Sequence, residues 1–288
     1  MGVGDIQQFS RGLCIWTPSK MSTKQYNVFL DLDSTCISSL EVASTPMSLI
    51  ENLESHGIES LEMEGIFHVT QRPGLQSFLD FLFENFNVSV WTAASKAYAE
   101  WIIPRFITGQ PNGKPTKGVR ELDFFLWGDQ CEMCQTKYGA ETTKDLSIFW
   151  NHFTVPGYDH SNTIILDDNC VAVWDGQECS CMLIRGYEAD DLSPWDDDEL
   201  RKAKAHLIRI KNGQTDGMCP VGDGMYTTPT EIGELYGDVL NARDDTMSVP
   251  NDGLSDTSSN SGSSIVSDIG PSEVDMTVLP SDSISQVG

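Results

Sequence analysis

The chain has 288 residues, of which 39% are hydrophobic and 9% aromatic, as expected for a globular protein with an apolar core. Its 43 acidic and 18 basic residues give a net charge of −25. This charge argues against binding to duplex nucleic acid or to anionic membranes, because both need a cationic face. No apolar run reaches the roughly 18 residues of a membrane helix, and residues 1–16 lack the pattern of a secretory signal. We therefore expect a cytoplasmic or nuclear protein that is not secreted and makes no direct contact with membranes or nucleic acid.

Apolar runs alternate with helical patterns between residues 27 and 211. Along the chain, the pattern predicts a strand at 27–31, a helix at 75–86, a strand at 87–92, an alanine-rich helix ending near 105, a strand at 122–127, a short helix at 144–150, strands at 163–166 and 181–184, and a helix at 196–211. This alternation is typical of an α/β protein whose mostly parallel sheet is covered by helices on both faces.

Two segments depart from the alternation. Residues 61–69 alternate apolar and polar side chains, which predicts a small β-hairpin outside the sheet. Residues 244–288 contain 12 Ser and 8 acidic residues but no Lys or Arg. Such a segment buries too little apolar surface to offset the entropy of ordering it, so we expect a disordered, acidic, Ser-rich tail.

Eight cysteines are too few for a disulfide scaffold, so reduced thiols are the preferred interpretation. Cys131 and Cys134 form a CxxC pair, and Cys179 and Cys181 form a CxC pair. A zinc site usually needs two well-spaced pairs on turns, and these two pairs do not fit that pattern. Zinc at these four cysteines remains the alternative interpretation.

Polar side chains gather where three of the predicted strands end. Asp31 ends the first strand and Asp33 follows it, Thr92 ends the second, and Asp167 and Asp168 follow the fourth. Each acid alone is better explained by a helix cap or a turn. Ligands, however, bind at the carboxyl ends of parallel strands, where converging carboxylates would repel one another unless a cation lay between them.

Oxygen ligands without His or Cys favour Mg²⁺ at this edge of the sheet. Lys144 would add a second positive charge. A site with Mg²⁺, a lysine and a hydroxyl suits a phosphoryl group, and we therefore expect a phosphoryl-transfer site.

Several motifs in order resemble a known family. The segment DLDST at 31–35 resembles the first motif of haloacid dehalogenase-superfamily phosphatases. RPG at 72–74, WTAAS at 91–95, KDLS at 144–147 and LDD at 166–168 are similar to the RNA polymerase II C-terminal-domain phosphatases, also called the NLI-interacting-factor-like family. The versions encoded by large DNA viruses are the most similar, and the resemblance covers residues 26–211.

This resemblance implies a Rossmann-like haloacid dehalogenase fold without a large cap domain. The implied organisation is an N-terminal extension at 1–25, a phosphatase domain at 26–211, a C-terminal extension at 212–243 and the tail at 244–288. Two residues depart from the family pattern, Ser34 where relatives often have Glu and Cys36 where Leu or Val is usual. The segment between Thr35 and Arg72 is short and unlike that of the cellular enzymes.

The resemblance also implies catalytic roles. Asp31 would be the nucleophile that accepts the phosphoryl group, and Asp33 the acid and base. Thr92 would hydrogen-bond the phosphoryl oxygens, and Lys144 would neutralise them and orient Asp31.

A metal site is implied in the same way. Asp31, the backbone carbonyl of Asp33 and Asp168 would hold Mg²⁺, with Asp167 close to the metal.

The expected function is that of a Mg²⁺-dependent phosphoserine and phosphothreonine protein phosphatase that forms an aspartyl-phosphate. Its expected partner is a phosphorylated protein or peptide, for which a peptide like the C-terminal domain of RNA polymerase II is the candidate. A non-catalytic peptide-binding module on the same fold and a small-molecule phosphatase remain as alternatives. The oligomeric state stays open.

Overall fold

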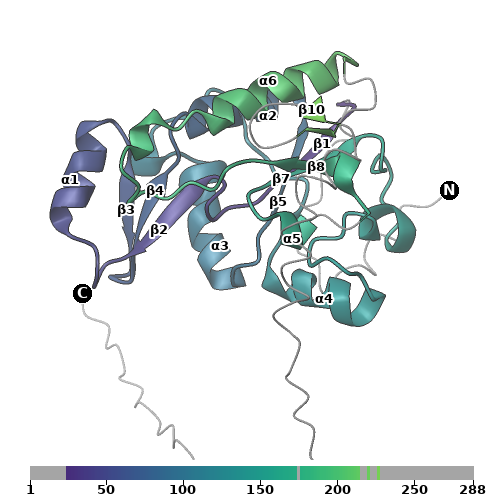
Figure 1. The fold of residues 1–288 in the computed structure, drawn as a ribbon, viewed down its shortest axis with the longest axis horizontal. Coiled ribbons are helices and arrows are strands. Elements are labelled where there is room, and N and C mark those ends of the chain that lie inside the picture. Colours follow the sequence, from purple (N-terminus) through teal and green to yellow (C-terminus); the bar gives the residue numbers. More distant parts are fainter. Residues whose placement is uncertain (1–23, 174–175, 215–218, 221–225, 228–288) are drawn as a thin grey trace, which may run out of the picture. The chain divides into compact units, whose positions relative to one another are not determined.

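The computed structural model describes residues 24–173, 176–214, 219–220 and 226–227 (Figure 1). Cys14, most of the predicted N-terminal extension and the predicted Ser-rich tail lie outside these residues. No helix in the described ranges is both long and apolar enough to cross a membrane.

The central sheet has five parallel strands in the order β6-β5-β1-β7-β8. Their bounds are β1 Asn27–Leu30, β5 Asn87–Trp91, β6 Phe125–Leu126, β7 Thr163–Asp167 and β8 Cys181–Leu183. Every residue of β1, β5 and β7 is buried, which explains their nearly continuous apolar sequences. All five predicted strands are present, although β6 is shorter than predicted.

Helices cover both faces of this sheet. In β1, Val28 and Leu30 pack in one apolar cluster, whereas Phe29 points into another, as expected from the two-residue repeat of a strand. The first cluster includes residues of α2 (Leu75–Asn85), α3 (Lys96–Ile102) and α6 (Glu199–Lys211). The second includes residues of α4 (Gly128–Tyr138) and α5 (Cys170–Val173). Figure 1 shows α2 and α6 side by side on one face. The predicted Rossmann-like α/β architecture is therefore confirmed.

An insertion between β1 and α2 forms a second, antiparallel sheet in the order β2-β4-β3. Its elements are β2 Ile37–Glu41, α1 Met47–Ser55, β3 Ser60–Met63 and β4 Phe67–Gln71. The predicted hairpin is β3 and β4, joined at Glu64 and Gly65, which both have positive φ as a tight hairpin turn requires. The prediction was incomplete, because the insertion also contains β2 and α1.

Two smaller features differ from the sequence prediction or add to it. The helix predicted at 144–150 is displaced, because residues 144–147 form a bend and a turn, and a π-helical turn follows at Ile148–His152. A two-residue pair, β9 (Cys219–Pro220) and β10 (Tyr226–Thr227), lies beyond α6 in the sequence. Short helical turns complete the described fold at Ile103–Ile107, Pro111–Gly113, Glu178–Ser180 and Pro194–Asp196.

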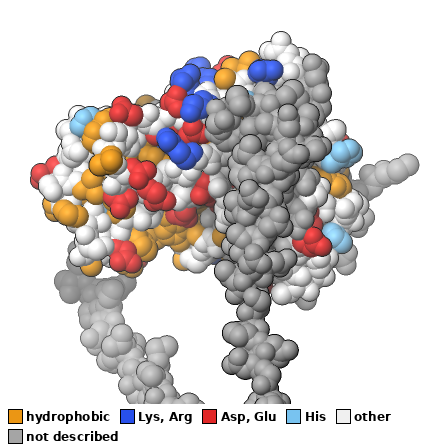
Figure 2. All heavy atoms as spheres, in the orientation of Figure 1, with side chains coloured by type: hydrophobic (Ala, Val, Ile, Leu, Met, Phe, Trp, Pro, Cys, Tyr) orange, Lys and Arg blue, Asp and Glu red, His pale blue; other side chains and the backbone are white. Residues whose placement is uncertain are grey.

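Charge is unevenly distributed on the face drawn in Figure 2. Acidic side chains are spread over the insertion, while basic side chains gather along α6. The basic residues of α6 are Arg201, Lys202, Lys204, Arg209 and Lys211.

Candidate active site

Three acidic side chains meet where β1 and β7 end. The two strands are parallel neighbours, and Leu30 of β1 lies opposite Leu166 of β7. The next residue in each strand is an aspartate, so Asp31 and Asp167 emerge side by side at the carboxyl edge of the sheet. The backbone N–H of Asp31 donates to the carbonyl of Leu166 at 3.0 Å and holds this register one residue further.

Oxygen atoms of Asp31, Asp167 and Asp168 all lie within 4.8 Å of one another. Among the described residues, no other group of three His, Cys, Asp or Glu side chains converges in this way. Asp31 is 6% exposed and Asp167 only 1% exposed. Buried carboxylates at such distances repel one another and need a compensating charge.

Lys144 supplies one compensating charge. Its Nζ donates to Asp31 Oδ1 at 2.6 Å and to Asp167 Oδ2 at 2.7 Å, and the side chain is buried. Its backbone is fixed on both sides, by a bond from its N–H to Ala172 and by the side chain of Gln177, which donates to its carbonyl. Burial alone would lower the pKa of Lys144, but the charges of Asp31 and Asp167 outweigh it and raise the pKa, so the ammonium persists.

One ammonium does not balance three carboxylates. Burial, and then the neighbouring Asp31, raise the pKa of both Asp167 and Asp168. The site thus has an excess of negative charge and consists of hard oxygen donors, the properties that suit a divalent cation such as Mg²⁺. The residues present therefore fit the predicted metal, with Asp31, Asp167 and Asp168 as the carboxylates available to it.

Asp33 stands apart from this cluster. Its Oδ1 accepts a hydrogen bond of 2.5 Å from the hydroxyl of Tyr98 on α3. Burial raises the pKa of Asp33 to about 6, against the opposing effect of the Tyr98 hydrogen bond. The two carboxyls of the DLDST motif thus have different partners, since Asp31 contacts a cation and Asp33 a hydroxyl.

Thr92 lies at the same edge of the sheet, next to β1. Leu30 of β1 is opposite Val90 of β5. Thr92, two residues after Val90, therefore lies beside the loop that follows β1. Thr92 is 1% exposed, and its hydroxyl oxygen accepts from the N–H of Ala94 at 3.1 Å. The hydroxyl hydrogen is therefore left to donate elsewhere, as the expected contact with a phosphoryl oxygen requires.

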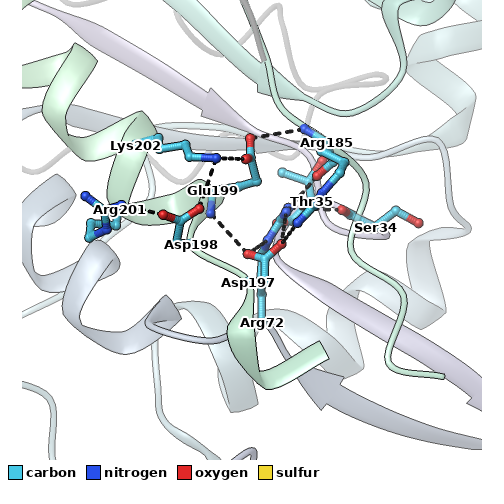
Figure 3. Close-up of polar contacts among 9 residues, drawn as sticks. All are labelled: Ser34, Thr35, Arg72, Arg185, Asp197, Asp198, Glu199, Arg201 and Lys202. Atoms are coloured by element: carbon cyan, nitrogen blue, oxygen red, sulfur yellow. Dashed lines mark hydrogen bonds and ion pairs between the residues drawn. The ribbon is translucent and has the colours of Figure 1, made fainter. Parts of the chain in front are cut away.

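A buried arginine fixes the loop that follows Asp33 (Figure 3). Arg72 forms two parallel bonds with the carboxylate of Asp197, at 2.7 and 2.8 Å. It also donates to the carbonyls of Ser34, Thr35 and Arg185. Ser34 has a φ of 55°, a left-handed conformation that is uncommon for a side chain with a Cβ. Arg72 therefore supports a turn whose backbone is unfavourable by itself.

Three features of the site were missed in the sequence. The sequence places Tyr98 in an alanine-rich helix, and no local pattern links it to Asp33, 65 residues away. The partner of Arg72 lies 125 residues further along the chain. Gly186 lies against the site, since a Cβ there would be 3.3 Å from Asp168 Oδ2. None of these pairings has a signal in one sequence, because each depends on how distant segments pack.

The four candidate zinc cysteines are distributed over three elements. Cys131 and Cys134 are buried on α4, Cys179 is exposed, and Cys181 is buried on β8. Within the described ranges, no cysteine belongs to a group of three possible metal ligands. The described residues therefore do not provide a zinc site.

Comparison with known proteins identifies the family. Residues 26–217 match the family model of NLI interacting factor-like phosphatases. The chain is 33% identical over 188 residues to the putative CTD phosphatase-like protein 355R of invertebrate iridescent virus 6, covering 65% of this chain and 99% of that protein. It is 30% identical over 192 residues to the protein of the same name from invertebrate iridescent virus 3, covering 66% and 99% respectively. The solved structure of Fcp1, described as an essential RNA polymerase II CTD phosphatase, aligns with a TM-score of 0.43 and 18% identity, over 66% of this chain and 63% of that one. The matched motifs and the viral relatives agree, and the chain belongs to the NLI interacting factor-like phosphatase family.

Proposed function

We propose that this protein is a Mg²⁺-dependent phosphatase that removes phosphate from phosphoserine and phosphothreonine in proteins, through an aspartyl-phosphate. The observation that carries the proposal is the pair of carboxyls in one loop with separate partners. Asp31 is held by Lys144 in the acidic cluster, and Asp33 lies outside the cluster with Tyr98. Two carboxyls in different environments are what nucleophilic and acid-base roles require.

In the first step, a carboxylate oxygen of Asp31 attacks the phosphorus atom. The new bond between this oxygen and phosphorus forms as the bond from phosphorus to the ester oxygen breaks. The ester oxygen takes the bonding electrons and the proton of Asp33, and leaves as the serine or threonine hydroxyl. Lys144 orients Asp31 and offsets the charge of the phosphoryl oxygens, to which Thr92 donates a hydrogen bond.

In the second step, Asp33 is ionised and removes a proton from a water molecule. The water oxygen bonds to phosphorus, and the bond between phosphorus and Asp31 breaks. Asp31 recovers its carboxylate, Asp33 recovers its proton, and inorganic phosphate leaves. Both residues therefore end the cycle as they began it.

The acidic cluster would serve this chemistry as the metal site. Asp31, Asp168 and the backbone carbonyl of Asp33 would hold Mg²⁺, with Asp167 beside it, and the metal charge would stabilise the developing negative charge on the phosphoryl group. Thr35 orients one of these ligands, since its hydroxyl donates to Asp168 Oδ1 at 3.2 Å.

A phosphopeptide is the proposed substrate. The described insertion consists of three short strands and one helix, which is small compared with a domain that could enclose a metabolite. Its hairpin turn presents Ile66, which is 53% exposed, while Met63 and Phe67 pack against the core. An exposed apolar side chain on a small insertion suits contact with a peptide, and the viral relatives are named putative CTD phosphatase-like proteins.

The test compares substrate classes on the full chain with Mg²⁺. We expect higher kcat/KM for phosphoserine and phosphothreonine peptides, including peptides of the polymerase C-terminal-domain repeat, than for sugar phosphates. Faster turnover of the sugar phosphates would instead indicate a small-molecule phosphatase. Binding of the phosphopeptide without any turnover would indicate a peptide-binding module.

A further inference from the structure

We propose that Tyr98 is a positioning residue for Asp33, and that the insertion holds Tyr98 in place through Ser39. This inference rests on the proposed function, because it assigns Asp33 its role in proton transfer. It adds a residue outside the sequence motifs and gives the insertion a part in the chemistry.

The contact between Tyr98 and Asp33 is short and directed. The Tyr98 hydroxyl donates to Asp33 Oδ1 at 2.5 Å, a length typical of a hydrogen bond to a carboxylate. The backbone at Tyr98 is fixed as well, since its N–H donates to the side chain of Ser95, the cap of α3. Tyr98 therefore approaches Asp33 from the first turn of a capped helix.

The insertion holds the other side of Tyr98. Ser39 of β2 lies with its hydroxyl oxygen 2.6 Å from the Tyr98 hydroxyl oxygen. Phe67 of β4 packs its ring edge-on against the Tyr98 ring, with centroids 6.2 Å apart. Because the Tyr98 hydroxyl donates its only hydrogen to Asp33, the Ser39 hydroxyl must be the donor in the second bond. The hydrogen bonds then run in one direction, from Ser39 to Tyr98 to Asp33.

This direction decides which oxygen of Asp33 carries the proton. Oδ1 is occupied as an acceptor, and within the described part of the chain no hydrogen bond to Oδ2 is found. The proton that reaches the leaving group would therefore be carried on Oδ2. Tyr98 would fix the carboxyl plane and so the direction in which Oδ2 points, and loss of its hydroxyl would let the carboxyl rotate.

The experiment measures kcat/KM for Tyr98→Phe with a series of phosphate esters, from aryl phosphates with acidic leaving groups to phosphoserine peptides. This parameter reports the step in which the leaving group departs, and an alkoxide needs the proton of Asp33 far more than an aryl oxide does. We expect a loss of about tenfold on phosphoserine peptides and less than about twofold on the best aryl ester. The Phe ring retains the packing against Phe67.

Two further variants make the test specific. Ser39→Ala should show the same dependence on leaving group with a smaller loss, about threefold on the phosphoserine peptide, and should add nothing to Tyr98→Phe in the double variant. Tyr158→Phe is the matched control. This variant also removes a tyrosine hydroxyl that donates to an aspartate, since Tyr158 donates to Asp123 at 2.8 Å. Asp123, however, lies in the segment before β6 and is not one of the proposed site residues. Its kcat/KM should stay near wild type for every ester.

Asp33→Asn separates this inference from the proposed function. If Asp33→Asn loses most activity on the poor leaving groups but Tyr98→Phe loses activity equally on all esters, Tyr98 contacts the substrate or only supports the fold, and the inference is wrong. If Asp33→Asn itself shows no dependence on leaving group, the role assigned to Asp33 in the proposed function is wrong.

Discussion

Two buried ionic clusters flank the loop after β1, and they differ in charge balance. On one side, the guanidinium of Arg72 meets the carboxylate of Asp197, with exposed side-chain fractions of 0% and 5%. On the other, the ammonium of Lys144 faces Asp31 and Asp167, which converge with Asp168. The first cluster pairs one buried charge with one buried charge, with the exposed Arg185 3.4 Å from Asp197 at its edge. The second has three carboxylates for one ammonium.

The difference extends to hydrogen bonds. A guanidinium has five N–H donors, and Arg72 makes five contacts, two with Asp197 and one each with the carbonyls of Ser34, Thr35 and Arg185. No donor is left for a ligand. In the Lys144 cluster, carboxylate oxygens outnumber the donors that reach them. Burial therefore does not distinguish the two clusters, whereas uncompensated charge does, and this charge supports the proposed role of the Lys144 cluster as the metal site.

The largest expected effect comes from Asp31→Asn. This variant keeps the shape of the side chain but removes the nucleophile, so we expect turnover to fall by at least about four orders of magnitude. Without Mg²⁺, its melting temperature should not fall, because the substitution relieves repulsion in a cluster with excess negative charge. Turnover and thermal unfolding measured on the same preparation check both expectations.

An Asp31→Asn protein with Mg²⁺-dependent turnover near wild type would contradict the aspartyl-phosphate. Beryllofluoride provides an independent measurement, since it mimics a phosphoryl group on a carboxylate. It should inhibit the wild-type protein only when Mg²⁺ is present.

In contrast to Asp31→Asn, Arg72→Met should mainly lower the stability of the fold. It leaves the buried Asp197 with only the exposed Arg185, whose guanidinium lies 3.4 Å away, and breaking a buried pair costs about 3–5 kcal/mol of unfolding free energy. Urea unfolding followed by circular dichroism should show this loss. The double variant with Asp197→Asn should recover part of it, because the uncompensated charge is gone. A loss below about 1 kcal/mol in Arg72→Met would mean that the balanced cluster is not a structural support.

Mg²⁺ should stabilise the protein through the other cluster alone. At a concentration 100 times its Kd, a ligand that binds only the folded state adds about 2.7 kcal/mol. We expect the melting temperature to rise by several degrees with Mg²⁺ in the wild-type protein and to change little in Asp168→Asn. Arg72 variants that remain folded should keep the shift. An equal shift in Asp168→Asn would place the metal elsewhere.

Much of this molecule was predictable because its signals are local. The strands β1, β5 and β7 are buried on both faces, so each is a short apolar run in the sequence. The site acids follow these strands directly, and parallel neighbours with aligned ends bring them together. Position in the chain was therefore enough to predict that Asp31 and Asp167 meet.

The rest depends on tertiary contacts. Strand β2 has the sequence ISSLE, which carries little β-signal, and its pairing with β4 defines it. Helix α1 begins after Pro46 without a side-chain cap, so no capping signal marks its start. The helix predicted at 144–150 is displaced because the side chain of Gln177 donates to the carbonyl of Lys144, the acceptor that a helix starting there would use. A single sequence contains no record of these contacts.

The smallest expected effect concerns ion pairs at the surface next to the balanced cluster. Arg201 pairs with Asp198 within the first turn of α6, and their side chains are 74% and 38% exposed (Figure 3). Water already solvates both charges, so we expect Arg201→Gln to change the unfolding free energy by less than about 0.5 kcal/mol in the urea experiment used for Arg72→Met. Asp198 also keeps Lys202 as a partner at 3.0 Å, which further limits the loss. Because Arg201 and Arg72 are both arginines paired with an aspartate, a loss in Arg201→Gln comparable to that in Arg72→Met would show that pairing alone, without burial, stabilises this region. A small loss would leave burial as the property that makes the Arg72 pair structural.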